Sequence, residues 1–219
     1  MPALVSQRMP ELMSRDRETL DALLASSVLA HIGVAVAEAD GTTRATVFPT
    51  AFAVIDGSLV VHGSTGSRWM RSLLDQEVSV TVTRLEGVVV ARSTFESSMR
   101  YRSAMIFGRF SPVDDARKAD VLAALSDRFI PGRSAEVRPS SKKELAATLL
   151  LELPIETWAL RVSDGWAEDG PEDCAGDAWS GHVRFGAPAT EIVAAPDTRP
   201  GIPIPASVRE LAAHPERLV

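Results

Sequence analysis

The fold of this chain is decided by the stretch FPTAFAVIDGSLVVHGSTGSR, residues 48–68. Two apolar runs, residues 46–55 and 58–62, flank Asp56-Gly57, a dipeptide typical of a two-residue hairpin turn. A loop of small residues follows, and the spacing of apolar residues after it predicts a short helix over residues 66–74. The stretch therefore predicts an antiparallel hairpin that ends in a strand–loop–helix turn.

Further strands are predicted on both sides of this stretch. Apolar residues alternate with others along residues 28–36, and Asp40-Gly41 marks another hairpin turn. Downstream strands are predicted at 78–83, 88–90, 101–110, 149–153 and 155–162, with a turn at Glu86-Gly87. Six or more short strands joined by tight turns, without a βαβ rhythm, favour a closed or nearly closed antiparallel barrel.

Few helices are expected. Asp16 is a candidate N-cap for a helix with leucines on one face, and Asp114 or Asp115 for a helix that ends near Phe129. Ser141 and Glu144 have the spacing of a capping box that opens a third helix. The predicted fold class is therefore mainly β with a few peripheral helices.

Composition excludes several classes of function. The 219 residues carry a formal net charge of -6 without a basic run, which disfavours nucleic acid and anionic membrane surfaces as partners. No apolar stretch is long enough to span a membrane, and the N-terminus lacks the apolar core of a signal peptide. Cys174 is the single cysteine, so no internal disulfide is possible and a cytoplasmic location is expected.

The chain divides by composition at about residue 165. We expect residues 1–165 to form the barrel domain with its N-terminal helix. Residues 166–219 hold half of the 14 prolines and are expected to form an extension that wraps the domain or a partner. A disordered tail is the alternative, although Trp166 and Trp179 favour partial docking, since disordered segments usually lack such anchors.

The loop after the second predicted strand is a candidate anion site. His62, Gly63 and Ser64 lead into it, and Ser67 and Arg68 begin the helix. A helix start offers unpaired backbone N–H groups, and hydroxyl groups and a guanidinium add donors, so this turn suits a phosphate. The alternative is an ordinary helix start with a surface arginine.

Two other segments are candidates for contacts with a ligand. Phe48-Pro49-Thr50 places a proline within a strand, so the strand must be at an edge or locally open, and exposed backbone groups there could bind a flat polar ring. A plain bulge is the alternative. Residues 91–103 are dense in donors, and the candidates there are Arg92, Ser93, Tyr101 and Arg102. A solvated loop is the alternative for this segment.

Other chemistries find no support in the sequence. The four histidines are isolated, without the spacing of metal ligands, so no metal site is predicted. There is no G-x-S-x-G nucleophile elbow, and the loop lacks the ending of a nucleotide-binding P-loop. Cys174 lies in an acidic segment that would not activate its thiol.

In this order, the segments resemble the pyridoxamine 5′-phosphate oxidase superfamily, and within it the flavin-nucleotide-binding branch related to nitroimidazole-resistance proteins. The resemblance runs from about residue 24 to residue 162. It is carried by AHIGVAV, FPTAFAVIDGSLVVHGSTGSRWMRSL, LEGVVVARSTF, SMRYRSAMIFGRF and IPGRSAEVRPSSKKELAAT.

The resemblance implies a six-stranded Greek-key split barrel that forms a homodimer with flavin mononucleotide (FMN) at the interface. Ser67 and Arg68 would hold the FMN phosphate, and the isoalloxazine ring would lie near Pro49 and Thr50. His62, Gly63 and Ser64 match the loop that precedes the family's phosphate-binding helix.

The chain also departs from the family pattern. Trp69 stands where the oxidase has a lysine, and Glu96, Ser97 and Arg100 stand where close relatives often have two histidines and an asparagine. The oxidase's C-terminal substrate-binding signature is not evident. True pyridoxamine 5′-phosphate oxidase activity is therefore not expected.

The leading hypothesis is an FMN-dependent oxidoreductase of unknown substrate, with an electron donor such as NAD(P)H. The alternative is a flavin or heme carrier without turnover, and FAD and heme are the alternative cofactors. No catalytic residue is identified. His62 and Tyr101 are candidates for a general acid by their chemistry alone.

Overall fold

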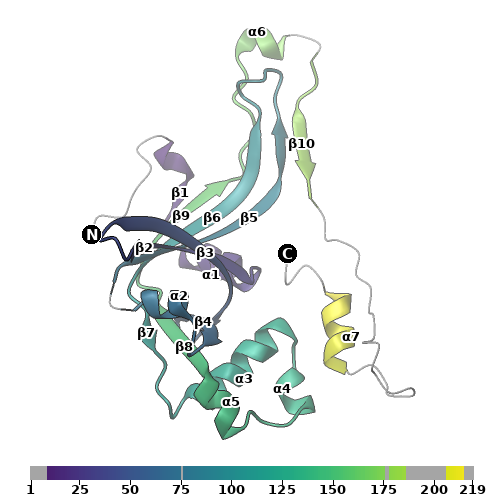
Figure 1. The fold of residues 1–219 in the computed structure, drawn as a ribbon. Coiled ribbons are helices and arrows are strands. Elements are labelled where there is room, and N and C mark those ends of the chain that lie inside the picture. The colour runs from purple at the N-terminus through teal and green to yellow at the C-terminus, as the bar shows by residue number, and fades with distance from the viewer. Residues whose placement is uncertain (1–8, 75, 176–177, 186–205, 215–219) are drawn as a thin grey trace.

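The computed structural model describes residues 9–74, 76–175, 178–185 and 206–214. Their strands form one curled antiparallel sheet in the order β1-β9-β6-β5-β2-β3-β4-β8-β7, with β10 paired to β5 (Figure 1). The strands are β1 (Met13–Ser14), β2 (Leu29–Ala37), β3 (Thr43–Ile55), β4 (Ser58–Ser64), β5 (Val78–Val90), β6 (Ser98–Gly108), β7 (Ser111–Pro112), β8 (Thr148–Pro154), β9 (Thr157–Ser163) and β10 (Gly181–Arg184). The mainly β split barrel is confirmed, with ten strands in place of six.

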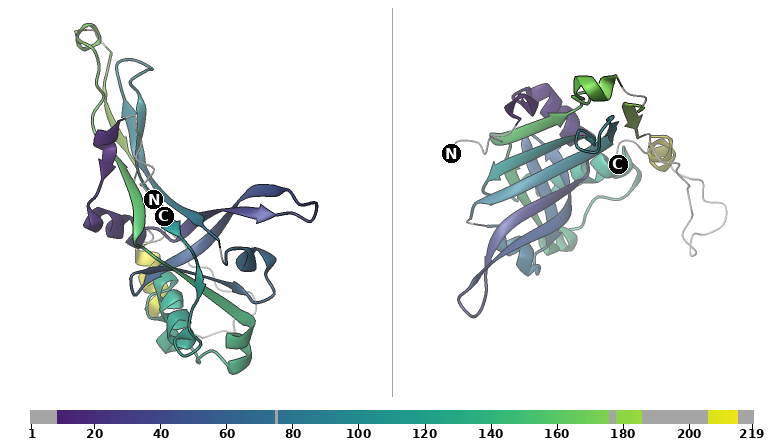
Figure 2. Two further views of the ribbon diagram at one scale, coloured as in Figure 1. Left: turned by 90° about the vertical axis from the view of Figure 1, so that its left-hand side faces the viewer. Right: turned by 90° about the horizontal axis from the view of Figure 1, so that it is seen from above.

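Helices lie around the sheet rather than between its strands (Figures 1 and 2). They are a 3-10 turn η1 (Pro10–Leu12), α1 (Arg17–Ala25), α2 (Arg68–Ser72), α3 (Lys118–Phe129), α4 (Arg133–Glu136), α5 (Lys142–Ala147), α6 (Pro171–Cys174) and α7 (Ala206–Ala213). Within the described ranges, no helix is long and apolar enough to cross a membrane.

Local sequence signals explain where two helices start. Asp16 accepts hydrogen bonds from the backbone N–H groups of Glu18 and Thr19 and so caps α1, as predicted. Ser141 and Glu144 form the predicted capping box of α5. The predicted start of α3 at Asp114 or Asp115 is wrong, because Asp114 instead accepts from the N–H of Ala116 in a turn that precedes the helix.

The predicted hairpin turn at Asp56-Gly57 joins β3 to β4. Both residues have positive φ, 50° and 77°, as the tight turn between right-twisted strands requires. Strand β3 changes partner along its length, pairing over residues 43–51 with β2 and over residues 52–55 with β4. This change of partner joins the two halves of the sheet.

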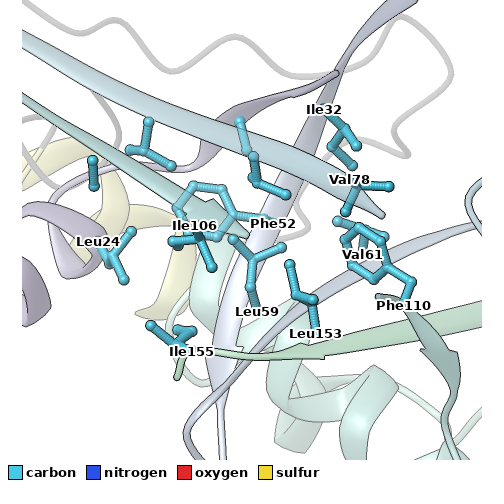
Figure 3. Packing of buried hydrophobic residues seen from close by; sticks show 14 of the residues in the cluster. Leu24, Ile32, Phe52, Leu59, Val61, Val78, Ile106, Phe110, Leu153 and Ile155 are labelled. Carbon is cyan, nitrogen blue, oxygen red and sulfur yellow. The ribbon is translucent and has the colours of Figure 1, made fainter. Parts of the chain in front are cut away.

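The curled sheet encloses one main apolar core. Phe52, Leu59 and Ile106 come from three strands, are fully buried, and lie against one another (Figure 3). Helix α1 covers this core with three buried leucines, Leu20, Leu23 and Leu24. A second, smaller core under α3 holds Val60, Val121, Leu125 and Leu150.

The predicted turn at Glu86-Gly87 is wrong, because β5 continues through it as a single strand. The register against β6 shifts between Leu85 and Gly87, which makes Glu86 the extra residue of a β-bulge. Gly87 has a φ of 154°, a conformation that glycine adopts at little cost. A Glu-Gly dipeptide can form a turn or a β-bulge, and the pairing of the strand determines which of the two forms.

Beyond the bulge, β5 and β6 project from the barrel as a two-stranded arm, seen at the top of Figure 1. The chain that follows β9 runs along this arm, and β10 pairs with residues 87–90 of β5. The division into a domain at 1–165 and a wrapping extension at 166–219 stays a prediction, since most of residues 186–219 lie outside the described ranges.

Candidate functional site

The turn between β4 and α2 is held by its own hydrogen bonds. The Thr65 N–H donates to the Ala147 carbonyl at 2.9 Å, and the Ser67 N–H donates to the Ser64 carbonyl at 2.9 Å. The Gly66 N–H donates to Ser64 Oγ at 3.1 Å. The backbone N–H groups of residues 65–67 are therefore already used, and other donors at this turn are left for a ligand.

Those remaining donors come from Ser67 and Arg68. Ser67 is the N-cap residue of α2, but its hydroxyl makes no capping hydrogen bond. Arg68 is exposed and forms no hydrogen bond or ion pair with any residue that the structure describes. The adjacent Arg71, in contrast, holds the loop by donating to the Thr65 carbonyl at 2.8 Å. We call Ser67 and Arg68 the anion turn.

Gly63 has a packing role at this turn. A Cβ atom at this position would lie 2.9 Å from Cγ of Met70 and 3.2 Å from its Sδ. Met70 is fully buried in the main core, so this close approach seats α2 against β4. The glycine thus fixes the position of the anion turn by admitting a core side chain.

Strand β3 is locally open beside its proline, as predicted. Pro49 pairs with His31 of β2, whereas β3 pairs with β4 only over residues 52–55. The missing N–H of Pro49 therefore costs no bond to a strand on the second side. Phe48, the preceding residue, stacks on Trp69 with ring centroids 5.1 Å apart, which brings β3 against α2.

His62 lies on the side of β4 that faces the second core, in register with Leu150. Its side chain is half-buried, and Nδ1 is buried without a hydrogen-bond partner among the described residues. Burial lowers the pKa of the imidazole from its ordinary value of 6.5. Burial therefore favours the neutral form of the His62 imidazole.

The third predicted segment lies on the arm and at its base, and the chain that follows β9 contacts it. Asp169, whose side chain is only 2% exposed, accepts from the Arg92 backbone N–H at 2.9 Å and from Nη1 at 3.0 Å. Arg102 donates to Glu86 and lies 3.5 Å from Asp164. We call the contact between Arg92 and Asp169 the arm clasp.

Ser93 also lies on the arm, whereas Tyr101 lies in β6 beside the bulge. Ser93 Oγ accepts from the Glu96 N–H at 3.2 Å within the loop at the end of the arm, and Tyr101 lies in β6 opposite Leu85. The structure thus joins the strand segment of Phe48, Pro49 and Thr50 to α2, which follows the anion turn, through the Phe48–Trp69 contact. It places the third segment on other elements.

Sequence reasoning missed a ring contact on the arm. The rings of Trp166 and His182 stack with centroids 3.8 Å apart and an angle of 12° between them. His182 Nδ1 lies 3.2 Å from Arg100 Nη1, and Nε2 is buried without a partner in the described part of the chain. No local pattern indicates this contact, because it depends on how β10 pairs with β5.

Solved structures similar to this chain include two that align with it over almost its whole length. The FAD and heme binding protein from Mycobacterium smegmatis is 47% identical, with a TM-score of 0.84 over 91% of this chain and 96% of that one. The flavocytochrome Anf3 from Azotobacter vinelandii is 31% identical, with a TM-score of 0.83 over 94% of each chain. Both alignments extend well past the barrel, into the region after β9.

A candidate 5-nitroimidazole antibiotic resistance protein from Bacteroides thetaiotaomicron shares the fold, with 16% identity and a TM-score of 0.56 over 68% of this chain and 86% of that one. No curated protein sequence matches the chain. The sequence profile described as pyridoxamine 5′-phosphate oxidase matches residues 16–162. The chain therefore belongs to the pyridoxamine 5′-phosphate oxidase family.

Proposed function

We propose that this protein binds a flavin nucleotide and uses it for redox chemistry. The observation that carries the proposal is the anion turn, where Ser67 and Arg68 keep donors without partners among the described residues, next to the Phe48–Trp69 stack. A guanidinium and a hydroxyl suit a phosphate group. The open side of β3 at Pro49 offers backbone groups to a flat heterocycle. Bound flavin would supply hydride or electron transfer, which the protein itself cannot perform.

The relatives favour FAD over the FMN expected from the sequence. The Mycobacterium smegmatis relative is an FAD and heme binding protein, and it is 47% identical to this chain. FMN and FAD share the phosphate next to the ribityl chain, so the anion turn serves either nucleotide. Mass spectrometry of the flavin released from the purified protein distinguishes the two.

A flavin and heme redox protein is the second candidate. Heme needs an axial ligand, and a buried imidazole nitrogen without a partner fits that need. Among the described residues, His62 Nδ1 and His182 Nε2 are such atoms, whereas His31 is exposed on β2. A Soret band in the purified protein that disappears in His62→Ala or His182→Ala would identify the ligand, and His31→Ala is the matched control.

We further propose a homodimer with the flavin at its interface. The face of the sheet opposite the main core exposes apolar side chains, including Leu29 at 51% and Val47 at 62%. These residues share that face, because Val47 is in register with Gly33, four residues along β2 from Leu29. Such a surface on a sheet is typical of a protein interface.

The substrate is not a pyridoxamine phosphate in this proposal. The oxidase lysine is replaced by Trp69, which packs on Phe48, and Arg92 is held by Asp169. A second phosphate dianion would need donors of its own. We expect no pyridoxal phosphate from pyridoxamine phosphate under air, and turnover on the order of 1–10 per second would refute this.

The experiment that tests the function is an absorbance spectrum of the purified protein, followed by anaerobic titration with NADH or NADPH. A flavin band that bleaches during the titration supports an NAD(P)H-linked oxidoreductase. A flavin band that remains unchanged supports a carrier that takes electrons from another donor. Absence of any flavin, both as purified and after incubation with FAD or FMN, contradicts the proposal.

A further inference from the structure

A cavity of about 200 Å³ lies between α1 and the inner face of β5 and β6. Thr19 and Ser26 line it from the side of α1, and Arg84, Glu86 and Arg102 line it from the strands. The strand residues continue the face that carries the buried Val82 and Ala104. None of these residues belongs to the anion turn or to β3.

Two arginines face each other at this cavity. Arg84 of β5 is the direct cross-strand partner of Arg102 of β6. Like charges placed directly opposite one another destabilise an antiparallel pair, so this arrangement works against the fold. Because the arginine pair does not stabilise the fold, we looked for a role of this pair in binding.

Among the residues that the structure describes, only one of the two arginines has acidic partners. Arg102 donates to Glu86, which the β-bulge places on this side, and lies 3.5 Å from the half-exposed Asp164. Arg84 is half-buried and makes no hydrogen bond or ion pair with any residue that the structure describes. The cavity therefore has two guanidinium groups and one carboxylate in its walls.

The donors left for a ligand are guanidinium N–H groups. The Thr19 hydroxyl donates to Asp16, and the Ser26 hydroxyl donates to the Leu23 carbonyl at 3.0 Å. Guanidinium groups bind phosphate and carboxylate through two parallel hydrogen bonds. A whole ligand site is usually about 300–1,000 Å³, so this cavity suits one charged group rather than a whole cofactor.

We propose that the cavity between α1, β5 and β6 is a binding site for an oxyanion, a phosphate or a carboxylate group, held by Arg84 and Arg102. The site is separate from the anion turn and does not depend on the flavin proposal. The bound anion supplies the negative charge that Arg84 lacks, and Glu86 holds Arg102 in place for it.

Calorimetric titration with inorganic phosphate and, separately, with acetate tests the site. The parent protein for both is Arg68→Ala, so that phosphate bound at the anion turn does not contribute. Arg84→Gln in this parent should weaken binding at least about tenfold, which corresponds to ~1.4 kcal/mol. Arg44→Gln, which changes an exposed arginine of β3 paired with Glu38, is the matched control and should leave binding unchanged.

The two anions distinguish the sources of the ligand. Tighter phosphate binding points to a phosphorylated ligand, and tighter acetate binding to a carboxylate. Equal affinity in Arg84→Gln and its parent, or no saturable binding of either anion at millimolar concentration, overturns the proposal.

Thermal melting separates a ligand site from a structural arginine. In buffer without phosphate or carboxylate, Arg84→Gln should melt about 1–3 °C higher than its parent, because the repulsion against Arg102 is removed. A lower melting temperature in that buffer would show that Arg84 supports the fold, and would contradict the proposal.

Discussion

The indole ring of Trp69 stacks on the phenyl ring of Phe48, with centroids 5.1 Å apart and 29° between the ring planes. Phe48 belongs to β3 and Trp69 to α2, and both pack against the main core. The contact joins two segments that are separate in the sequence. Pro49 and Thr50 directly follow Phe48, and the anion turn directly precedes Trp69. This aromatic pair therefore helps to set the distance between the two segments, together with the packing of Met70 at Gly63.

Replacement of Trp69 by alanine should loosen this connection. An aromatic pair contributes about 0.5–1.5 kcal/mol beyond its buried area, and the lost burial adds to this. We expect Trp69→Ala to lower the free energy of unfolding by about 2–4 kcal/mol and to weaken flavin binding. Trp179→Ala, at a position that is 65% exposed, should cost less than ~1 kcal/mol in the same denaturant titration. Similar losses in both variants would contradict this prediction.

The arm clasp should hold the chain after β9 against the arm. Asp169→Ala removes the acceptor for two hydrogen bonds from Arg92, one of them from the backbone. Hydrogen exchange of the β10 amides, residues 181–184, should become at least about tenfold faster, equal to ~1.4 kcal/mol of local stability. Asp173→Ala changes an exposed aspartate of the same segment and should leave exchange unchanged. Equal exchange rates in both variants would show that the clasp does not fix β10.

His62 should make stability depend on pH below neutrality. Burial lowers the pKa of its imidazole from 6.5, so the unfolded chain takes up this proton at a higher pH than the folded chain. The contribution to stability is therefore fully present above pH 6.5. It decreases as the pH falls from 6.5 towards the lower pKa of the folded state.

His62→Leu should reduce the loss of thermal stability between pH 7.5 and pH 5.5, two values chosen to lie about one unit on either side of 6.5. Leucine suits the site, because the cross-strand neighbour is Leu150. His31→Leu replaces an exposed histidine and should keep the pH dependence of the unchanged protein. A His62→Leu variant with that same pH dependence would show that His62 does not contribute.

The exposed sheet face should carry the dimer interface. Val47→Glu places a charge at a position that is 62% exposed, so the folded monomer should tolerate it. In a dimer interface the same carboxylate would be buried without a partner, which would destabilise the dimer. Light scattering at micromolar concentration should therefore show a shift from dimer to monomer. The control is Val54→Glu, which should stay dimeric. Val54 is 36% exposed and lies in β3 beyond the region paired with β2. A Val47→Glu protein that stays dimeric would place the interface elsewhere.

The sequence predicted the features that short-range chemistry determines. Asp56-Gly57, the Asp16 cap and the Ser141–Glu144 capping box each depend on residues a few positions apart, and all three are confirmed. The open side of β3 also followed from a local fact, since Pro49 has no backbone N–H. The phosphate role of Ser67 and Arg68 and the ring-binding role of Pro49 and Thr50 stay predictions.

Features that depend on distant partners were not predictable. The dipeptide Glu86-Gly87 predicted a turn, but the pairing of β5 with β6 makes it part of a β-bulge. Arg92 and Arg102 suggested free donors, because the sequence does not show that Asp169 and Glu86 would meet them. No local pattern indicates a role for Arg84, since its position matters only because Arg102 lies opposite it in β6.

The central claim is that flavin is held at the anion turn, and the affinity of the Arg68→Ala protein for flavin tests it most directly. FAD and FMN are titrated into deflavinated Arg68→Ala and Arg44→Ala proteins, and binding is followed by flavin fluorescence. A charge-assisted hydrogen bond contributes about 1.5–3 kcal/mol, so Arg68→Ala should weaken flavin binding about 10- to 150-fold. Arg44→Ala should bind as the unchanged protein does. Equal flavin affinity in the two variants would contradict the account.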